Sequence, residues 1–259
     1  MAYTAQLTSA ASDLHERMFP GYVSDYLRTD PELIERFDNF AFDEVIAGTP
    51  ELDERTRFMC WLATLLGCQG VDEFRGMASA ALNVGLEPVA LKEIVYQAVD
   101  YLGMGRVFPF LAVTNKVLEA HGVELPLPEQ ATTTPDHESR KAGGEQAQVA
   151  AFGEHMHGFH DAGTGSRKLI NQWLVRNCFG DFYTRNGLTM AERELMTFCY
   201  LAAQGGCEAQ LKAHAGGNLH CGTSLETLVA VVSSNLPFIG YPRTLNALSV
   251  LDEVAATQQ

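Results

Sequence analysis

The chain has 259 residues, of which 46% are hydrophobic, enough for one large domain or two small ones. Its formal net charge of -14 argues against nucleic-acid binding, which needs a basic surface. The start, MAYTAQLTSAASDLHERMF, has no basic or apolar stretch, so we expect no signal peptide, and we see no membrane-spanning run. Six cysteines without a Cys-x-x-Cys pair favour a reducing compartment, and we expect a cytoplasmic protein.

The sequence contains an internal repeat. Residues 52–68 resemble residues 190–207, because apolar, arginine and cysteine positions recur and both segments end in Gly-Cys. Residues 81–119 resemble residues 218–256 in the same way. The residues that align are Cys60 with Cys199, Cys68 with Cys207, Gly85 with Gly222, Leu91 with Leu228, Gly103 with Gly240 and Arg106 with Arg243. Duplication of a unit of about 110 residues explains this pattern.

Each copy is predicted to be helical. Apolar residues recur at helical spacing over 54–66 and 73–84, and Pro88 suits the first position of a helix over 89–102. No segment alternates apolar and polar residues as a strand would. We therefore predict an all-α protein made of two tandem helical units.

Two local signals refine the second half of each unit. Thr223 and Glu226 have the spacing of a capping box at the start of a helix. The segments GMG (103–105) and GYP (240–242) are expected to break the chain before a last helix in each copy.

The domain limits follow from the repeat. We predict a first unit over 1–122, a linker over 123–147 and a second unit over 148–259. The linker is rich in Pro, Thr, Glu and Gly and has few large apolar residues to bury, although part of it could lie along the body of the protein.

The second copy gathers four candidate site residues: Glu194, Cys207, His214 and Arg243. Cys207 and His214 lie two helical turns apart, so they share one helix face. A histidine beside a thiol can activate it, and a carboxylate can orient the imidazole for proton transfer. Each residue alone also fits an ordinary role: a buried thiol, a surface or capping histidine, a solvated helix start, or a locally paired arginine.

The first copy serves as an internal control for these candidates. The aligned pairs are Glu194 with Arg55, His214 with Met77, Cys207 with Cys68, and Arg243 with Arg106. The glutamate and the histidine therefore occur in one copy only, which favours one functional and one structural copy. The same comparison weakens Cys207, because its counterpart is retained where the other two are not. If the first copy contributes to the site, Arg106 and Cys68 are the residues to suspect.

A histidine-rich segment, EHMHGFHDAG (154–163), invites a metal hypothesis. It holds His155, His157 and His160, but no cysteine or carboxylate completes a familiar ligand spacing. We expect no metal here and interpret the three as histidines on the surface of a helix.

The stretch ERELMTFCYLAAQGGCEAQLKAHAGGNLHCGTSLETLVAVVSSNLPFIGYPRTLNALSVLDEV resembles the carboxymuconolactone decarboxylase family, which shares its fold with the alkyl hydroperoxidase D group. Residues 52–119 resemble it more loosely. The resemblance implies small helical units that assemble as trimers or hexamers, with sites near subunit interfaces. For a tandem chain it implies a homotrimer that imitates a hexamer of single units.

Within this resemblance, decarboxylation of a carboxylated lactone such as 4-carboxymuconolactone is the reaction we favour. His214 would be the general acid, Glu194 would orient it, and Arg243 would hold the anionic substrate. The reaction requires no cofactor and no metal.

Two alternatives remain. The peroxidase branch of the resemblance uses two thiols, and here Cys207 takes the first position while Gln210 occupies the second. Cys199 or Cys221 could replace the missing thiol only if the fold brings one of them close. The chain could also be a non-catalytic oligomeric protein that binds a ligand.

Overall fold

The computed structural model describes residues 4–257, which form helices and no strand. The all-α prediction is confirmed. The helices of the first half are α1 (Ser9–Met18), α2 (Tyr26–Thr29), α3 (Pro31–Asn39), α4 (Val45–Ala47), α5 (Glu54–Cys68), α6 (Val71–Asn83), α7 (Pro88–Leu102) and α8 (Met104–Ala120), with a π-helical segment η1 (Phe40–Glu44) before α4.

The second half repeats this order. Its helices are α9 (His137–Phe152), α10 (Ser166–Leu174), α11 (Met190–Gln204), α12 (Glu208–His220), α13 (Leu225–Ser234) and α14 (Leu236–Ala256), with the short turns η2 (Glu154–Met156) and η3 (Phe159–Asp161) and a π-helical segment η4 (Val175–Tyr183). No helix within residues 4–257 has the length and apolar character needed to span a bilayer.

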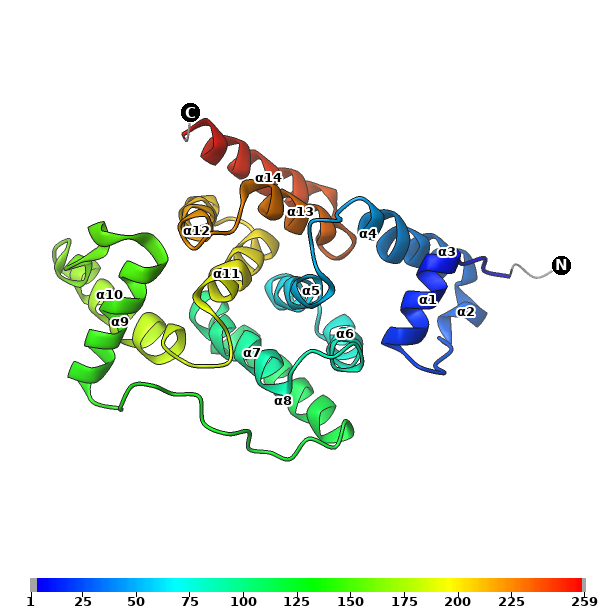
Figure 1. Ribbon diagram of the computed structural model, residues 1–259, viewed down its shortest axis with the longest axis horizontal. Helices are drawn as coiled ribbons and strands as arrows, with labels where there is room; N and C mark the ends of the chain where they lie inside the picture. Colours follow the sequence, from blue (N-terminus) through cyan, green and yellow to red (C-terminus); the bar gives the residue numbers. More distant parts are fainter. Residues whose placement is uncertain (1–3, 258–259) are drawn as a thin grey trace.

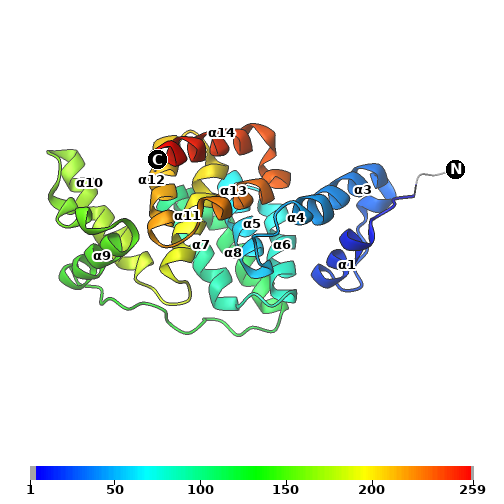
Figure 2. The ribbon, with the colours of Figure 1, turned by 45° about the horizontal axis from the view of Figure 1, so that its top comes forward.

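Helices α5 and α11, equivalent in the two copies, lie side by side at the centre of the molecule (Figure 1). Helices α6–α8 and α12–α14 surround them, while α1–α4 and α9–α10 extend on opposite sides, as a second view also shows (Figure 2). Gly67 allows the close approach, because a Cβ there would lie 2.7 Å from both the Cβ of Ala203 and the carbonyl oxygen of Tyr200.

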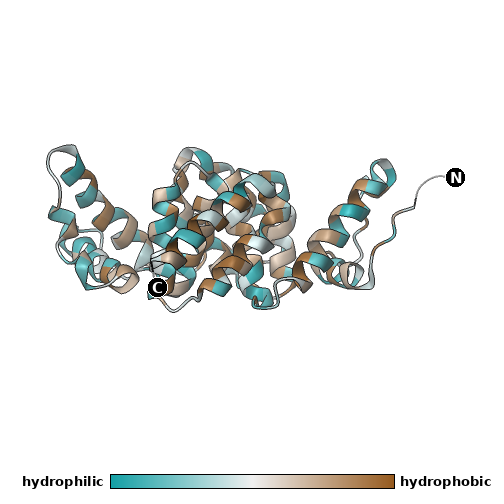
Figure 3. Cartoon of the chain, turned by 90° about the horizontal axis from the view of Figure 1, so that it is seen from above, coloured by the Kyte–Doolittle hydropathy of each residue, from teal (hydrophilic) through white to brown (hydrophobic). Residues whose placement is uncertain are grey.

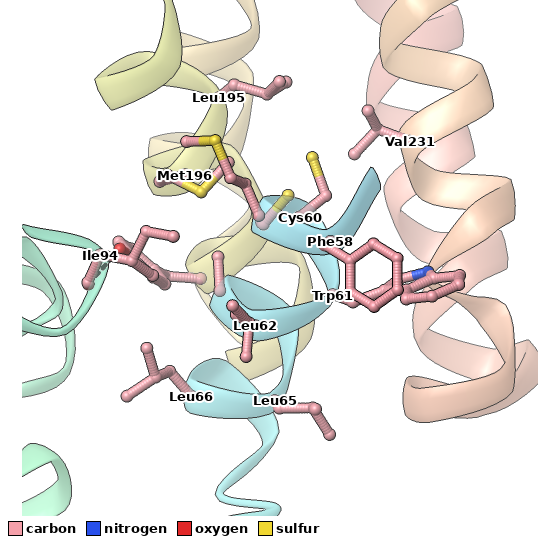
Figure 4. Packing of buried hydrophobic residues seen from close by; sticks show 14 of the residues in the cluster. Phe58, Cys60, Trp61, Leu62, Leu65, Leu66, Ile94, Leu195, Met196 and Val231 are labelled. Carbon is pink, nitrogen blue, oxygen red and sulfur yellow. Dashed lines mark hydrogen bonds between the residues drawn. The ribbon is translucent and has the colours of Figure 1, made fainter. Parts of the chain in front are cut away.

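The core is built around α5, whose residues from Arg57 to Gly67 are all buried. Trp61 and Phe58 pack against each other, and residues from α7, α11 and α13 close around the helix (Figure 4). A helix buried on every side is expected to be apolar around its whole circumference, as this one largely is. Hydrophobic residues accordingly concentrate in the central bundle (Figure 3).

The aligned glycines have matching backbone conformations, which confirms the repeat in the structure. Gly85 and Gly222 have φ of 102° and 92°, and Gly103 and Gly240 have φ of 79° and 73°. Only glycine adopts such values readily. Gly85 and Gly222 each lie between two helices, Gly103 separates α7 from α8, and Gly240 interrupts the helical backbone at the equivalent place inside α14. The predicted breaks before the last helix of each copy are confirmed.

The predicted capping box at Thr223 is wrong by one residue. The amide of Thr223 donates to the carbonyl of Asn218 at the end of α12, so Ser224 caps α13 instead and accepts from the amide of Thr227. A reciprocal capping box does occur at the start of α11, between Thr189 and Glu192.

Helix α9 begins inside the segment predicted as a linker. Asp136 caps it by accepting from the amides of Glu138 and Ser139. The glycines that suggested a flexible stretch permit close packing instead, since a Cβ on Gly144 would collide with the carbonyl of Val175 in η4. The part before residue 137 has no helix and runs along the body of the protein (Figure 1). The domain limits themselves stay a prediction.

Candidate functional site

A cavity of ≈ 990 Å³ lies between the end of α7, α9, η4, α11 and α12. Its wall is mostly apolar and aromatic, with a small number of polar groups, which is usual for sites that bind organic molecules. The lining residues are Asp100, Tyr101, Gln148, Phe152, His155, Met156, Phe159, Asn171, Leu174, Phe179, Leu201, Gln204, Cys207, Gln210, Ala213, His214, Gly216, Gly217 and His220.

The structure joins Glu194 and His214, as the sequence predicted. Glu194 on α11 has no exposed surface, and its Oε2 lies 2.8 Å from Nδ1 of His214 on α12. Gly217 makes room for this contact, because a Cβ there would collide with the glutamate carboxyl group. A carboxylate can only accept, so Nδ1 carries a proton and Nε2 is left for a molecule in the cavity.

Hydroxyl groups complete the surroundings of the buried carboxylate. Tyr183 donates to Oε1 of Glu194 at 2.8 Å. The Tyr183 oxygen also lies 2.7 Å from the hydroxyl oxygen of Tyr101 and 2.8 Å from that of Thr197. Because Tyr183 donates its one hydroxyl proton to the carboxylate, the hydroxyls of Tyr101 and Thr197 must both donate to Tyr183. Burial raises the pKa of Tyr183 and of Tyr101 well above the usual tyrosine range, so both stay neutral donors. The chain of hydroxyls therefore points toward Glu194.

Aromatic rings hold the imidazole of His214 in place. Its ring lies between those of Tyr101 and Phe152, edge to face, with both centroid distances 5.3 Å. Asn218 ties α12 to α11, because its amide donates to the backbone carbonyls of Glu194 and His214. Such fixed neighbours hold the ring of a histidine in one orientation.

The first copy contributes to this site through α7. Tyr101 and Asp100 line the cavity, and neither was singled out in the sequence. Oδ2 of Asp100 is buried without a hydrogen-bond partner, and burial raises the pKa of this carboxyl to about 7. Arg106, suspected from the repeat, does not line the cavity itself, but it donates a hydrogen bond to Gln204, which does. Cys68, the other suspect, does not line the cavity.

Cys207 lies on the cavity wall without a second thiol beside it. Its sulfur donates to the carbonyl of Leu201 at 3.5 Å and accepts from Gln204 at 3.6 Å. Gln210, at the second thiol position of the peroxidase pattern, lines the cavity as well. Cys199 is buried and contacts Asn235, and Cys221 points at the backbone of α9. Neither of them reaches the cavity wall.

Arg243 lies apart from His214. Its Nη1 donates to the carbonyl of Ala203 in the last turn of α11, where a helix leaves carbonyl groups unpaired and favours a positive charge. With Cys207 it lines a separate small pocket, not the cavity that His214 faces. Burial raises the pKa of Cys68, and nearby Arg243 partly offsets this rise. The predicted contact of Arg243 with a substrate at His214 does not fit this placement.

The histidine-rich segment forms two short 3-10 turns and no α-helix, which corrects the interpretation of its three histidines. His160 is buried, and its Nδ1 and that of His157 each lie 3.9 Å from the same oxygen of Glu145. His155 turns toward the cavity. Within residues 4–257, no group of three or more His, Cys, Asp and Glu side chains is arranged to hold a metal ion.

Comparison with known families gives a match over both copies. The model of the carboxymuconolactone decarboxylase family matches residues 31–116 and 169–253, which together exceed half of the chain. The matched regions cover α3–α7, η1 and most of α8 in the first copy, and η4, α11–α13 and most of α14 in the second. No curated protein matches the sequence.

Proposed function

Because the chain belongs to the carboxymuconolactone decarboxylase family, we propose that it is a cofactor-independent proton-transfer enzyme that decarboxylates a carboxylated lactone or a related acid. The observation that carries this proposal is the 2.8 Å contact between buried Glu194 and His214 on the wall of a ligand-sized cavity. A histidine oriented by a buried carboxylate is a suitable general acid and base at neutral pH.

The reaction assigns a step to each group. When the carbon–carbon bond to the carboxylate breaks, CO₂ leaves and the bonding electrons form a dienolate. Protonated His214 then delivers the proton from Nε2 to carbon, and it takes a new proton from solvent for the next turnover. Glu194 stabilises the imidazolium through Nδ1, and Tyr183 stabilises Glu194. Arg243 has no part in this scheme, since its guanidinium bonds the backbone outside the cavity.

Replacing His214 with glutamine is expected to lower CO₂ release from 4-carboxymuconolactone about 10²–10⁴-fold, the usual contribution of general acid–base catalysis. The measurement is CO₂ release together with deuterium incorporation into the lactone product in D₂O. His157→Gln is the matched control, because this exposed histidine does not line the cavity. A wild-type chain without activity, or an equally active His214→Gln variant, would contradict the proposal.

Cys207 supports a second candidate, a thiol-dependent peroxidase, because its sulfur lies on the same cavity wall. Its thiolate would attack a peroxide, releasing an alcohol or water and leaving a sulfenic acid that an external thiol must reduce. This function predicts that Cys207→Ser abolishes thiol-dependent peroxide consumption. Decarboxylation instead predicts that the same variant keeps CO₂ release within a few-fold of wild type. If neither activity appears, an oligomeric ligand-binding role is left, and the expected homotrimer can be tested by its mass in solution.

A further inference from the structure

Two histidines outside the proton-transfer pair converge at the mouth of the same cavity. His155 lies in η2 and His220 is the last residue of α12. Their Nδ1 atoms lie 3.7 Å and 3.9 Å from the position that a Cβ on Gly153 would occupy. Gly153 ends α9 with φ of 101°, so the turn that brings His155 to His220 requires glycine.

These two imidazoles are exposed and line the cavity. No hydrogen bond or ion pair engages either side chain within the described part of the chain, residues 4–257. The neighbouring histidines differ in this respect, because His157 pairs with Glu154 and His160 with Asp161. Free polar groups that point at one cavity mouth are suited to binding a ligand.

Apart from histidines, the cavity wall offers no positively charged side chain that could bind an anion. The wall includes no lysine or arginine, and its one carboxyl group is that of Asp100, since Glu194 lies behind His214. The titratable groups on the wall besides the two histidines are Asp100, Tyr101, Cys207 and His214. The other titratable groups on α9, η2, η3, α10 and α12 and just after α12 are His137, Glu138, Arg140, Lys141, Glu145, Glu154, His157, His160, Asp161, Arg167, Lys168, Glu208, Lys212 and Cys221.

We propose that His155 and His220 form a subsite that binds the carboxylate of an organic acid at the cavity mouth. The aromatic and aliphatic wall between them and His214, with Phe152, Phe159 and Leu174, would hold the apolar body of that acid. The inference rests on the proposed function only in placing the reacting carbon at His214.

Binding at this subsite is expected to be stronger at acid pH for two reasons. Protonation of an imidazole, which acid pH favours, adds a positive charge that attracts a carboxylate. Burial raises the pKa of Asp100 to about 7, so this carboxyl is neutral at pH 6 and repels an anion only at higher pH. Both changes act in the same direction between pH 6 and pH 8.

The test uses benzoate, an unreactive aromatic carboxylate, and the full chain, with binding measured by calorimetry. We expect the dissociation constant of benzoate to rise about tenfold or more in the His155→Gln/His220→Gln double variant, as loss of hydrogen bonds to a charged group implies. It should also rise about tenfold from pH 6 to pH 8 in the wild type, whereas neutral benzamide should show neither effect. His157→Gln is the control, since this histidine lies on the same segment but off the cavity wall.

Three outcomes would overturn the subsite: no binding of millimolar benzoate at pH 6, equal binding to the double variant, or equal binding of benzamide and benzoate at pH 6. His214→Gln separates this inference from the proposed function, because it should lower turnover about 10²–10⁴-fold while leaving benzoate bound. If His214→Gln retained turnover while the double variant lost benzoate, the proposed function would fail and the subsite would stand.

Discussion

Replacing Glu194 with glutamine is expected to slow the proton-transfer step about 10²–10⁴-fold without unfolding the protein. The reason lies in the direction of the hydrogen bonds. Tyr183 already accepts from Tyr101 and Thr197, so its hydroxyl can only donate to the side chain at position 194. The glutamine oxygen must then face Tyr183, and its NH₂ group must face His214.

An NH₂ group facing Nδ1 reverses the direction of the hydrogen bond between residue 194 and His214. Nδ1 of His214 becomes the acceptor, so in the neutral ring the proton moves to Nε2, and the imidazolium loses its counter-charge. His214 is then poorly able to cycle a proton on the cavity side. The rate is measured with the substrate that wild type turns over, and the thermal midpoint is measured alongside.

The matched variant is Tyr183→Phe, which removes one donor to Glu194 but keeps the carboxylate and the histidine contact. A hydrogen bond to a charged group contributes roughly 1.5–3 kcal/mol, so the loss of rate should be smaller than for the glutamine variant. If Glu194→Gln turned over within a few-fold of wild type, the proposed role of Glu194 in orienting His214 for proton transfer would be wrong.

The sequence alone singled out one pair of candidate site residues, whose catalytic role stays a prediction. Glu194 and His214 stood out because the first copy has Arg55 and Met77 at the aligned positions, so packing of the repeated unit does not require them. The structure brings the pair together at 2.8 Å. The helices were also predictable, since their apolar spacing, Pro88 and the recurring glycines are local signals.

Other parts of the site depend on contacts that no local pattern encodes. Tyr101 and Asp100 belong to the first copy and reach the cavity only because α7 packs on α11. The role of Arg243 in substrate binding stays a prediction, and its placement in the structure agrees better with the internal control. Arg106 aligns with Arg243, and recurrence in both copies indicates a structural role, here the capping of carbonyl groups at the end of α11.

Replacing Glu93 with glutamine is expected to lower the free energy of unfolding by about 3–5 kcal/mol, as breaking a buried ion pair does. Glu93 on α7 and Arg193 on α11 are each 1% exposed, and the carboxylate lies 3.2 Å from Nη2 of Arg193. Burial lowers the pKa of Arg193, and Glu93 opposes this effect. Without the carboxylate, the guanidinium charge would be buried with no counter-charge. Arg185, the other partner of Glu93, is partly exposed and can turn to solvent.

Urea titration at pH 7 measures this change, and Glu87→Gln is its control. Glu87 also pairs with an arginine, Arg55, but both side chains are exposed, so its loss should cost less than about 1 kcal/mol. Equal destabilisation by the two variants would contradict the prediction.

Glu93→Gln should also affect the candidate site, because α7 presents three residues at successive helical turns to the second copy. Glu93 holds Arg193, Gln97 donates to the backbone of Arg193 and to Thr197, and Tyr101 reaches Tyr183 and the ring of His214. Residues four apart lie on one helix face. Loss of the Glu93–Arg193 ion pair is therefore expected to loosen the packing of the α7 face that carries Tyr101 against the second copy. The first copy lacks a glutamate–histidine pair of its own, yet its α7 positions the pair of the second copy, which is a physical reason for both copies to remain in one chain.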